Sequence, residues 1–147
     1  MDYLIDEIDR QIVGCLAEDA RMSLKVLSAR VGLTSPSTAE RVKRLEERGV
    51  IQGYGAHVNL AALDYTLQAM VRVRPMPGML HKVDKMIQAI PECIECDKVT
   101  GEDCFVMRLV VRSIEQLDEL LDGLAEYAQS NTAIVKSSPV KRRLPPI

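Results

Sequence analysis

The stretch LTSPSTAERVKRLEERGVI, residues 33–51, predicts a turn, a helix and the end of that helix in continuous order. Thr34 is suited to cap the free N–H groups of a helix start, and Pro36 is tolerated in a first turn, where no intrahelical donor is needed. Gly49 is typical of the residue that ends a helix. Within this helix, four basic residues fall in eight positions: Arg41, Lys43, Arg44 and Arg48.

Two shorter helices are predicted upstream of this stretch. Asp6 is placed to cap the first, and Ser23 is placed to cap the second. Gly32 follows the second helix directly, as expected for a left-handed residue after a helix. Three short helices with a tight, glycine-containing turn between the last two form the helix-turn-helix pattern. The next residues, 51–58, predict either a hairpin wing or a connecting strand.

The charge of the chain changes sharply along this region. The formal net charge of all 147 residues is −2. Residues 1–20 carry one basic and six acidic side chains, whereas residues 21–48 carry seven basic and three acidic ones, so the local charge changes from −5 to +4. A local positive charge of this kind is typical of a polyanion-binding face. The alternative is a solvated helix face, on which glutamates pair with the basic residues: Glu40, Glu46 and Glu47.

The second half of the chain follows a different pattern. Residues 66–74 alternate between apolar and polar side chains, which predicts a half-buried strand. Further strands are expected over residues 93–100, 104–112 and 133–140, with helices over residues 80–90 and 114–128. Ser113 and Gln116 are expected to form a capping box at the start of the second of these helices. The order is βαββαβ, which is the ferredoxin-like plan.

The predicted fold class is therefore α+β. Its N-terminal domain is a helix-turn-helix of winged-helix-like kind over residues 1–52, and its ferredoxin-like domain covers residues 65–147, with a connecting segment over residues 53–64. The sheet face opposite the helices would carry Met70, Val106 and Val110. Because apolar patches of this kind usually mark interfaces, we expect a partner subunit to cover this face.

Three segments resemble the feast/famine, or Lrp/AsnC, family of bacterial and archaeal transcription regulators. IDEIDRQIVGCLAEDARMS is similar to the opening helix of the family, and LSARVGLTSPSTAERVKRLEERGVIQGY is similar to its helix-turn-helix core. VTGEDCF resembles a loop in its ligand-sensing domain. The resemblance covers nearly the whole chain. It implies a DNA-binding regulator that forms homodimers, which often assemble into octamers, and that responds to an amino acid bound between sensing domains.

Double-stranded DNA is the partner expected for the basic helix. Polar residues at the start of a recognition helix contact base edges and phosphates. Longer basic residues on the same side of the helix can contact the DNA as well. The expected contact residues on this helix are Ser35, Ser37, Thr38, Arg41, Arg44 and Arg48. Two more, Arg21 and Lys25, are expected over the DNA backbone.

The family loop commonly has the pattern Gly-x-x-Asp-aromatic. Aligning Gly101 and Phe105 with it places Cys104 at the aspartate position and Asp103 one residue early. A shift of one residue turns a side chain to the other face of a strand, so Asp103 does not simply inherit the family role. Two interpretations stay open, a plain tight turn and an effector-binding loop. The candidate effector residues are Thr100, Gly101, Asp103, Cys104, Thr132 and Lys136.

Other site classes are weakly supported by the sequence. Cys93 and Cys96 have a C-x2-C spacing, but positions three apart on a strand point to opposite faces, so buried thiols are favoured over a metal site. Thiol sensing through Cys104 is a hypothesis. The two histidines do not suggest a catalytic set, and no cofactor is expected. No apolar run approaches the ~20 residues that span a bilayer, and the acidic N-terminus is unlike a signal peptide, so a cytoplasmic protein is expected.

Three functions compete on this evidence. The leading interpretation is a DNA-binding transcription regulator and not an enzyme. The second is an architectural protein that wraps DNA with little sequence preference. The third is an enzyme, because some relatives of the family decarboxylate a haem precursor with the same two-domain plan; the basic recognition helix and the scarcity of histidine argue against it.

Overall fold

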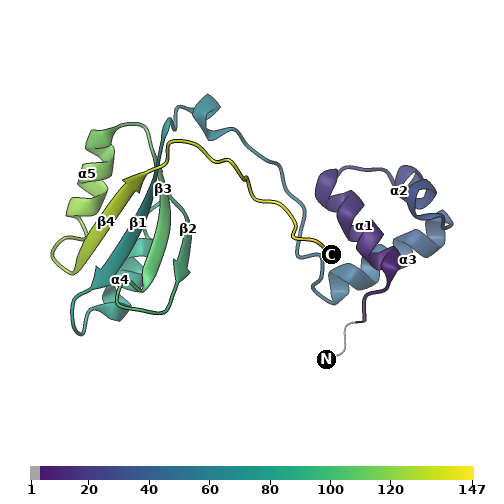
Figure 1. The fold of residues 1–147 in the computed structure, drawn as a ribbon, viewed down its shortest axis with the longest axis horizontal. Coiled ribbons are helices and arrows are strands. Elements are labelled where there is room, and N and C mark those ends of the chain that lie inside the picture. The colour runs from purple at the N-terminus through teal and green to yellow at the C-terminus, as the bar shows by residue number, and fades with distance from the viewer. Residues whose placement is uncertain (1–3) are drawn as a thin grey trace. The chain divides into compact units, whose positions relative to one another are not determined.

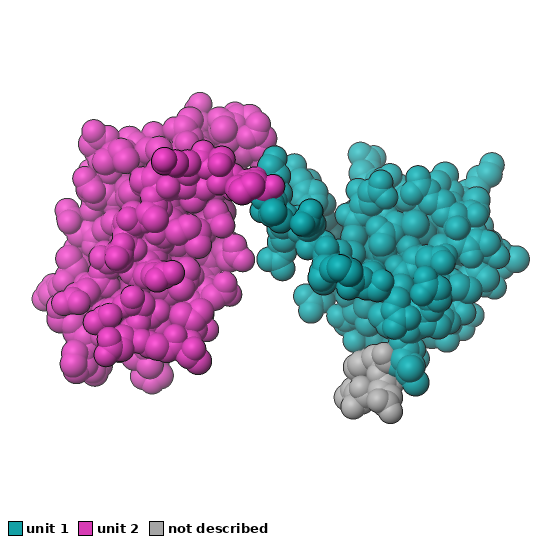
Figure 2. All heavy atoms as spheres, viewed as in Figure 1, with its two compact units in different colours: residues 1–57, 140–147 teal, residues 58–139 magenta. Residues whose placement is uncertain are grey.

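The computed structural model describes residues 4–147, and residues 1–3, the beginning of the predicted DNA-binding domain, lie outside the described residues. The chain divides into two compact units. One contains residues 1–57 together with residues 140–147, and the other contains residues 58–139 (Figure 2). The C-terminal tail thus groups with the first unit, although it follows the last strand of the second.

The first unit is built from three helices, α1 (Glu7–Glu18), α2 (Leu24–Val31) and α3 (Ser35–Glu47) (Figure 1). The three predicted caps are confirmed. The side chains of Asp6, Ser23 and Thr34 each accept a hydrogen bond from a backbone N–H of the first turn that follows. Gly32 has a φ of 71°, the left-handed conformation that lets the chain turn directly from α2 toward α3.

A small aliphatic core holds these helices together. Its buried residues, one or two from each helix, are Ile12, Leu27, Val31 and Leu45. Residues 51–58 lie beside this core without forming a strand. Both alternatives predicted for this segment, a hairpin wing and a connecting strand, are therefore wrong, because a strand needs a paired neighbour and these residues have none within residues 4–147. They form an extended connection instead.

The second unit contains a short 3-10 turn, η1 (Leu60–Leu63), and a four-stranded antiparallel sheet. The strands are β1 (Leu67–Pro75), β2 (Cys93–Lys98), β3 (Phe105–Val111) and β4 (Ala128–Ile134). Their order across the sheet is β2-β3-β1-β4, and α4 (Leu80–Gln88) and α5 (Ile114–Asp122) complete the βαββαβ order (Figure 1). The predicted ferredoxin-like plan is confirmed.

The two faces of the sheet differ in burial. Alternate residues of the central strands, among them Val71, Val73 and Met107, are completely buried in a core shared with α4 and α5. The opposite face carries the predicted Met70 and Val106, which are half-buried, and Val110, which is already buried within the chain. No helix within residues 4–147 is long and apolar enough to cross a membrane.

The C-terminal elements differ from the prediction. Strand β4 begins at Ala128, five residues before the predicted start at 133, because its backbone pairs with β1 from Ala128 opposite Pro75 onward. Helix α5 ends at Asp122, so Leu124 and Ala128 are buried outside it. Only one of the two hydrogen bonds of the predicted capping box is formed. Ser113 caps the helix, but the Gln116 side chain accepts from the backbone N–H of Arg112.

Candidate nucleic-acid interface and ligand hollow

The first turn of α3 presents two small polar side chains to solvent. Ser35 and Ser37 are exposed, and the Thr34 hydroxyl donates to the Ser37 hydroxyl across 3.0 Å. Pro36 lies between them in the first turn, where it costs no hydrogen bond. Thr34 already accepts the Ser37 backbone N–H, so the hydroxyl groups of the two serines are the donors of this turn that suit phosphate oxygens.

Thr38 does not belong to this exposed set. Its side chain is completely buried, and its hydroxyl donates to the Thr34 carbonyl across 2.9 Å. The expectation that Thr38 contacts DNA is therefore corrected. One turn of helix carries Thr38 to the face that packs on α1 and α2, where its role is to pack and to bond the backbone.

Arg41 forms ion pairs within the first unit. Its Nη1 lies 2.7 Å from Asp6 Oδ2 and 3.0 Å from Asp9 Oδ1, and 22% of its side chain is exposed. The hydrogen bond from the Arg41 guanidinium lowers the pKa of Asp6, and the same bond raises the pKa of Arg41. The DNA contact of Arg41 stays a prediction, and within the unit this cluster ties α3 to the start of α1.

Arg44 and Arg48 are the exposed arginines of α3 and its end. Together with Arg41 they line a polar hollow of about 240 Å³ that also contains Asp6 and Asp9. No ion pair of Arg44 or Arg48 is present among the described residues. The alternative interpretation expected glutamates of this helix to pair with its basic residues. Within α3, such an ion pair is present between Lys43 and Glu47, whose charged atoms are 3.8 Å apart. Arg21 and Lys25, around the start of α2, are exposed as well.

A second polar hollow lies on the open face of the sheet in the other unit. It has a volume of about 380 Å³ and includes the loop between β2 and β3. Its lining residues are Arg72, Arg74, Val99, Thr100, Gly101, Glu102, Asp103 and Val106. Gly101 has a φ of 105°, so the loop turns there in a conformation that other residues rarely adopt.

Arg74 bridges the two sides of this hollow. Its Nε is 2.9 Å from Asp103 Oδ1, and its Nη1 is 3.2 Å from Glu102 Oε2. The hydrogen bond to Asp103 raises the pKa of Arg74. Arg72 lies two residues before Arg74 on the same face of β1 and has no ion-pair partner among residues 4–147. The hollow therefore contains the unpaired Arg72 together with the carboxylates of Glu102 and Asp103, which both pair with Arg74.

Comparison with known proteins identifies both halves of the chain. Residues 5–46 match the AsnC-type helix-turn-helix domain, and residues 68–145 match the Lrp/AsnC ligand binding domain. The chain belongs to the Lrp/AsnC family. It is therefore a DNA-binding transcriptional regulator with a ligand-binding domain.

Individual relatives agree with this assignment over most of their length. The HTH-type transcriptional regulator LrpA of Mycobacterium tuberculosis is 36% identical over 133 residues, which cover 90% of this chain and 89% of that protein. A structure of the feast or famine regulatory protein of M. tuberculosis complexed with L-methionine has a TM-score of 0.87, with 33% identity over 95% of this chain and 97% of that one. The structure of Bacillus subtilis LrpC has a TM-score of 0.88 and 26% identity, covering 94% and 99% of the two chains.

The candidate effector residues of this Lrp/AsnC protein separate into two groups. Thr100, Gly101 and Asp103 line the hollow, whereas Cys104, Thr132 and Lys136 do not. Cys104 packs against the core that the sheet shares with α4 and α5. Thr132 lies opposite the buried Val71, and directly opposed residues share a face, so Thr132 points away from the hollow. Lys136 follows the end of β4 and is exposed.

The geometry assumed for the cysteines is corrected. A register shift between Cys93 and Glu95 places Cys93 opposite Leu109 and Cys96 opposite Met107, so both cysteines share the helix-side face. Cys96 is exposed, so the buried thiol predicted there is wrong, although partial desolvation by the neighbouring residues raises the pKa of its thiol to about 11. No cluster suited to a metal ion is found within residues 4–147.

Some residues of these sites were not anticipated. Asp6 was predicted only as a cap, and its pairing with Arg41 joins positions 35 residues apart. Arg72 and Arg74 were predicted on the polar side of their strand, but without a role. The alternation of that strand was the available signal, since it places both arginines on the open face. The loop that meets them there depends on strand pairing, which periodicity alone does not determine.

Proposed function

We propose that this protein is a sequence-specific regulator that binds DNA as a homodimer through α3. The observation that carries the proposal is the exposed start of α3, with Ser35 and Ser37, followed on the same helix by the unpaired Arg44. Serines at this position suit phosphates, and arginine suits guanine. Arg48, Arg21 and Lys25 would add backbone contacts from the helix ends. A regulator of this kind acts in the cytoplasm, where the chromosome lies.

We expect a dimer because one helix-turn-helix is a small DNA-binding module. A single helix-turn-helix binds weakly, and two related by a dyad match major grooves about 34–36 Å apart. The half-buried Met70 and Val106 on the open face of the sheet support pairing through the second unit. An octamer of four such dimers is the assembly that the family resemblance suggests. Measurement of molar mass by light scattering tests both states.

The DNA-binding proposal is tested by the affinity of the protein for the promoter of its own or a neighbouring gene across salt concentrations. Binding that weakens linearly with the logarithm of salt concentration is expected, since phosphate contacts release counterions. An absence of binding, or binding without a salt slope, would contradict the proposal. A random duplex of equal length separates a specific regulator from an architectural protein, because a specific regulator binds its site ~10³-fold or more tightly.

We further propose that the hollow beside the loop after β2 binds an amino acid. Arg72 would hold the carboxylate of the ligand, and Glu102 and Asp103 would face its ammonium group. The net charge of the four ionic lining residues is zero, which suits a zwitterion. The methionine complex of a relative supports this class of ligand. Binding between sensing domains would then shift the population of DNA-binding arrangements.

A thermal-shift screen against the twenty amino acids tests the effector proposal. A ligand at one hundred times its Kd is expected to stabilise the folded protein by about 2.7 kcal/mol. Arg72→Ala should remove the shift, and Lys85→Ala, on α4, should leave it intact. If no amino acid raises the melting temperature, the loop is the plain turn of the alternative interpretation. Binding of a tetrapyrrole in the same screen would instead favour the enzyme interpretation.

A further inference from the structure

The polypeptide leaves the second unit twice, from neighbouring points on the sheet. One connection enters at the start of β1, and the other leaves at the end of β4. These ends are adjacent because Ala69 lies opposite Ile134 and the Val135 backbone N–H donates to the Gln68 carbonyl across 2.9 Å. Each strand end therefore continues into a chain segment that belongs in part to the first unit, drawn in teal and in yellow in Figure 1.

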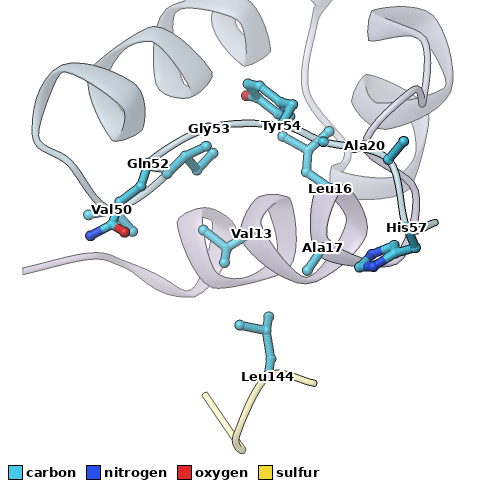
Figure 3. A pocket seen from close by; sticks show the side chains of 13 residues that line it. Val13, Leu16, Ala17, Ala20, Val50, Gln52, Gly53, Tyr54, His57 and Leu144 are labelled. Atoms are coloured by element: carbon cyan, nitrogen blue, oxygen red, sulfur yellow. The ribbon is translucent and has the colours of Figure 1, made fainter. Parts of the chain in front are cut away.

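Both connections reach the same hollow on the first unit. This hollow has a volume of about 410 Å³, and one of its walls is the C-terminal half of α1, including Val13 and Ala17. Residues 50–57 of the first connection form another wall, and Leu144 of the tail completes the lining. The Leu144 side chain points toward the face of α1 that carries Val13 and Ala17 (Figure 3).

We propose that the C-terminal tail, residues 140–147, is a strap whose Leu144 docks on α1. The strap gives the DNA-binding unit a second covalent connection to the sheet that holds the ligand hollow. Three observations carry the proposal. The tail groups with the first unit, Leu144 lines an apolar hollow, and Leu144 is 44% exposed whereas Val140 and Ile147 in the same tail are 62% and 55% exposed.

The sequence of the tail suits this role. Pro145 and Pro146 follow the docking residue directly, and proline restricts the backbone to an extended conformation, so less entropy is lost when the tail is ordered. Proline also has no N–H group, so this part of the tail leaves no backbone donor unpaired against the apolar wall. No acidic residue lies within the tail to oppose the basic residues beside Leu144.

The first connection is attached at the same place. The Tyr54 hydroxyl is 2.9 Å from Glu46 Oε1 on α3, and Tyr54 also lines the hollow. Arg72 and Arg74 lie on β1, directly opposite Asn131 and Gln129 of β4. A ligand that displaces β1 at the hollow on the sheet would therefore act on both strands from which the connections leave. With the strap docked, both connections carry that displacement to α1.

Hydrogen exchange of the full-length protein followed by mass spectrometry tests the strap. Leu144→Ser should accelerate exchange in residues 140–147 and 50–57 by about fivefold, the effect expected from losing part of a leucine's burial. Ile147→Ser is the matched control, because Ile147 lies in the same tail but does not line the hollow. Equal exchange in the two variants, with unchanged circular dichroism, would overturn the proposal.

A cysteine pair then tests whether the docked tail belongs to the same chain. Ala17→Cys combined with Leu144→Cys, oxidised and separated without reductant, should give a cross-linked species of monomer mass. Leu144→Cys alone measures the background from the four natural cysteines. A cross-linked dimer would show that the tail of a second copy occupies the hollow and would overturn the strap within one chain. An absence of any cross-link above background would also overturn it.

Discussion

The two units of this regulator have different cores and opposite charges. Among residues 4–147, the core of the first unit contains four buried apolar residues and that of the second contains twelve. Residues 1–57 with 140–147 carry eleven basic and nine acidic side chains, a charge of +2, whereas residues 58–139 carry eight and twelve, a charge of −4. The positive charge of the first unit therefore suits a polyanion such as DNA, and the larger core belongs to the second, acidic unit.

The largest expected effect comes from core truncation in either unit. Leu27→Ala in the first unit and Leu109→Ala in the second should each cost ~2–5 kcal/mol, since both leucines are essentially buried. The smaller core predicts that the first unit melts at lower temperature. In calorimetry, Leu27→Ala should lower only the lower transition and Leu109→Ala only the upper one. A single transition lowered by both would contradict independent units.

Removal of one exposed arginine tests whether the positive charge of the first unit drives DNA binding. Arg44→Ala is expected to weaken DNA binding by ~1–3 kcal/mol and to reduce the salt slope by about one, because Arg44 is free to contact DNA. Fluorescence anisotropy with a labelled operator measures both quantities. Lys85→Ala, a loss of the same charge from the second unit, should change neither. If both variants lose affinity alike, binding depends on total charge and not on α3.

Each unit contains an ion pair with a lowered aspartate pKa, and these pairs should respond separately to acid. Arg41 lowers the pKa of Asp6 in the first unit, and Lys98 lowers that of Asp84 in the second. A lowered pKa in the folded state stabilises the fold above the ordinary aspartate pKa of ~3.9, and that stabilisation is lost as the pH falls through the lowered value.

Substitution of the cation should flatten this acid dependence in one unit at a time. With Arg41→Met, the lower melting transition should depend less on pH between about 5 and 2, and with Lys98→Met the upper transition should do so. Melting curves at half-unit pH steps measure the slopes. An unchanged slope of the lower transition in Arg41→Met would mean that the Asp6 cluster adds nothing to the stability of the first unit.

The smallest effect is expected at Cys104. Cys104→Ser should leave ligand affinity within about twofold of the natural protein, because the thiol packs on the helix side of the sheet and does not line the hollow. The response of DNA binding to oxidant should be unchanged as well. Titration calorimetry and anisotropy with and without peroxide measure these two quantities. A large loss in either would assign Cys104 a sensing role after all.

Local sequence signals predicted most of the elements correctly. Asp6, Ser23 and Thr34 marked three helix starts, because a cap acts on the N–H groups next to it in the chain. The alternation of residues 66–74 identified the faces of β1. Prediction was poorest for β4, whose polar sequence contains no clear alternation and whose bounds depend on pairing with β1. The sequence also contained no sign of the register shift in β2 that places Cys93 and Cys96 on one face of the sheet.

Local sequence patterns were enough to predict the order of the elements, the helix-turn-helix and the segregation of positive charge. These depend on neighbours within a few residues and on composition. The folded chain was needed to show that Thr38 is buried, that Arg41 pairs with Asp6 and that Arg72 lines the same hollow as the loop at Gly101. Such outcomes depend on contacts between residues far apart in the chain, which local periodicity does not encode. The tertiary contacts of the basic helix therefore leave Arg44 and, just after its end, Arg48 as exposed arginines without an ion pair among the described residues.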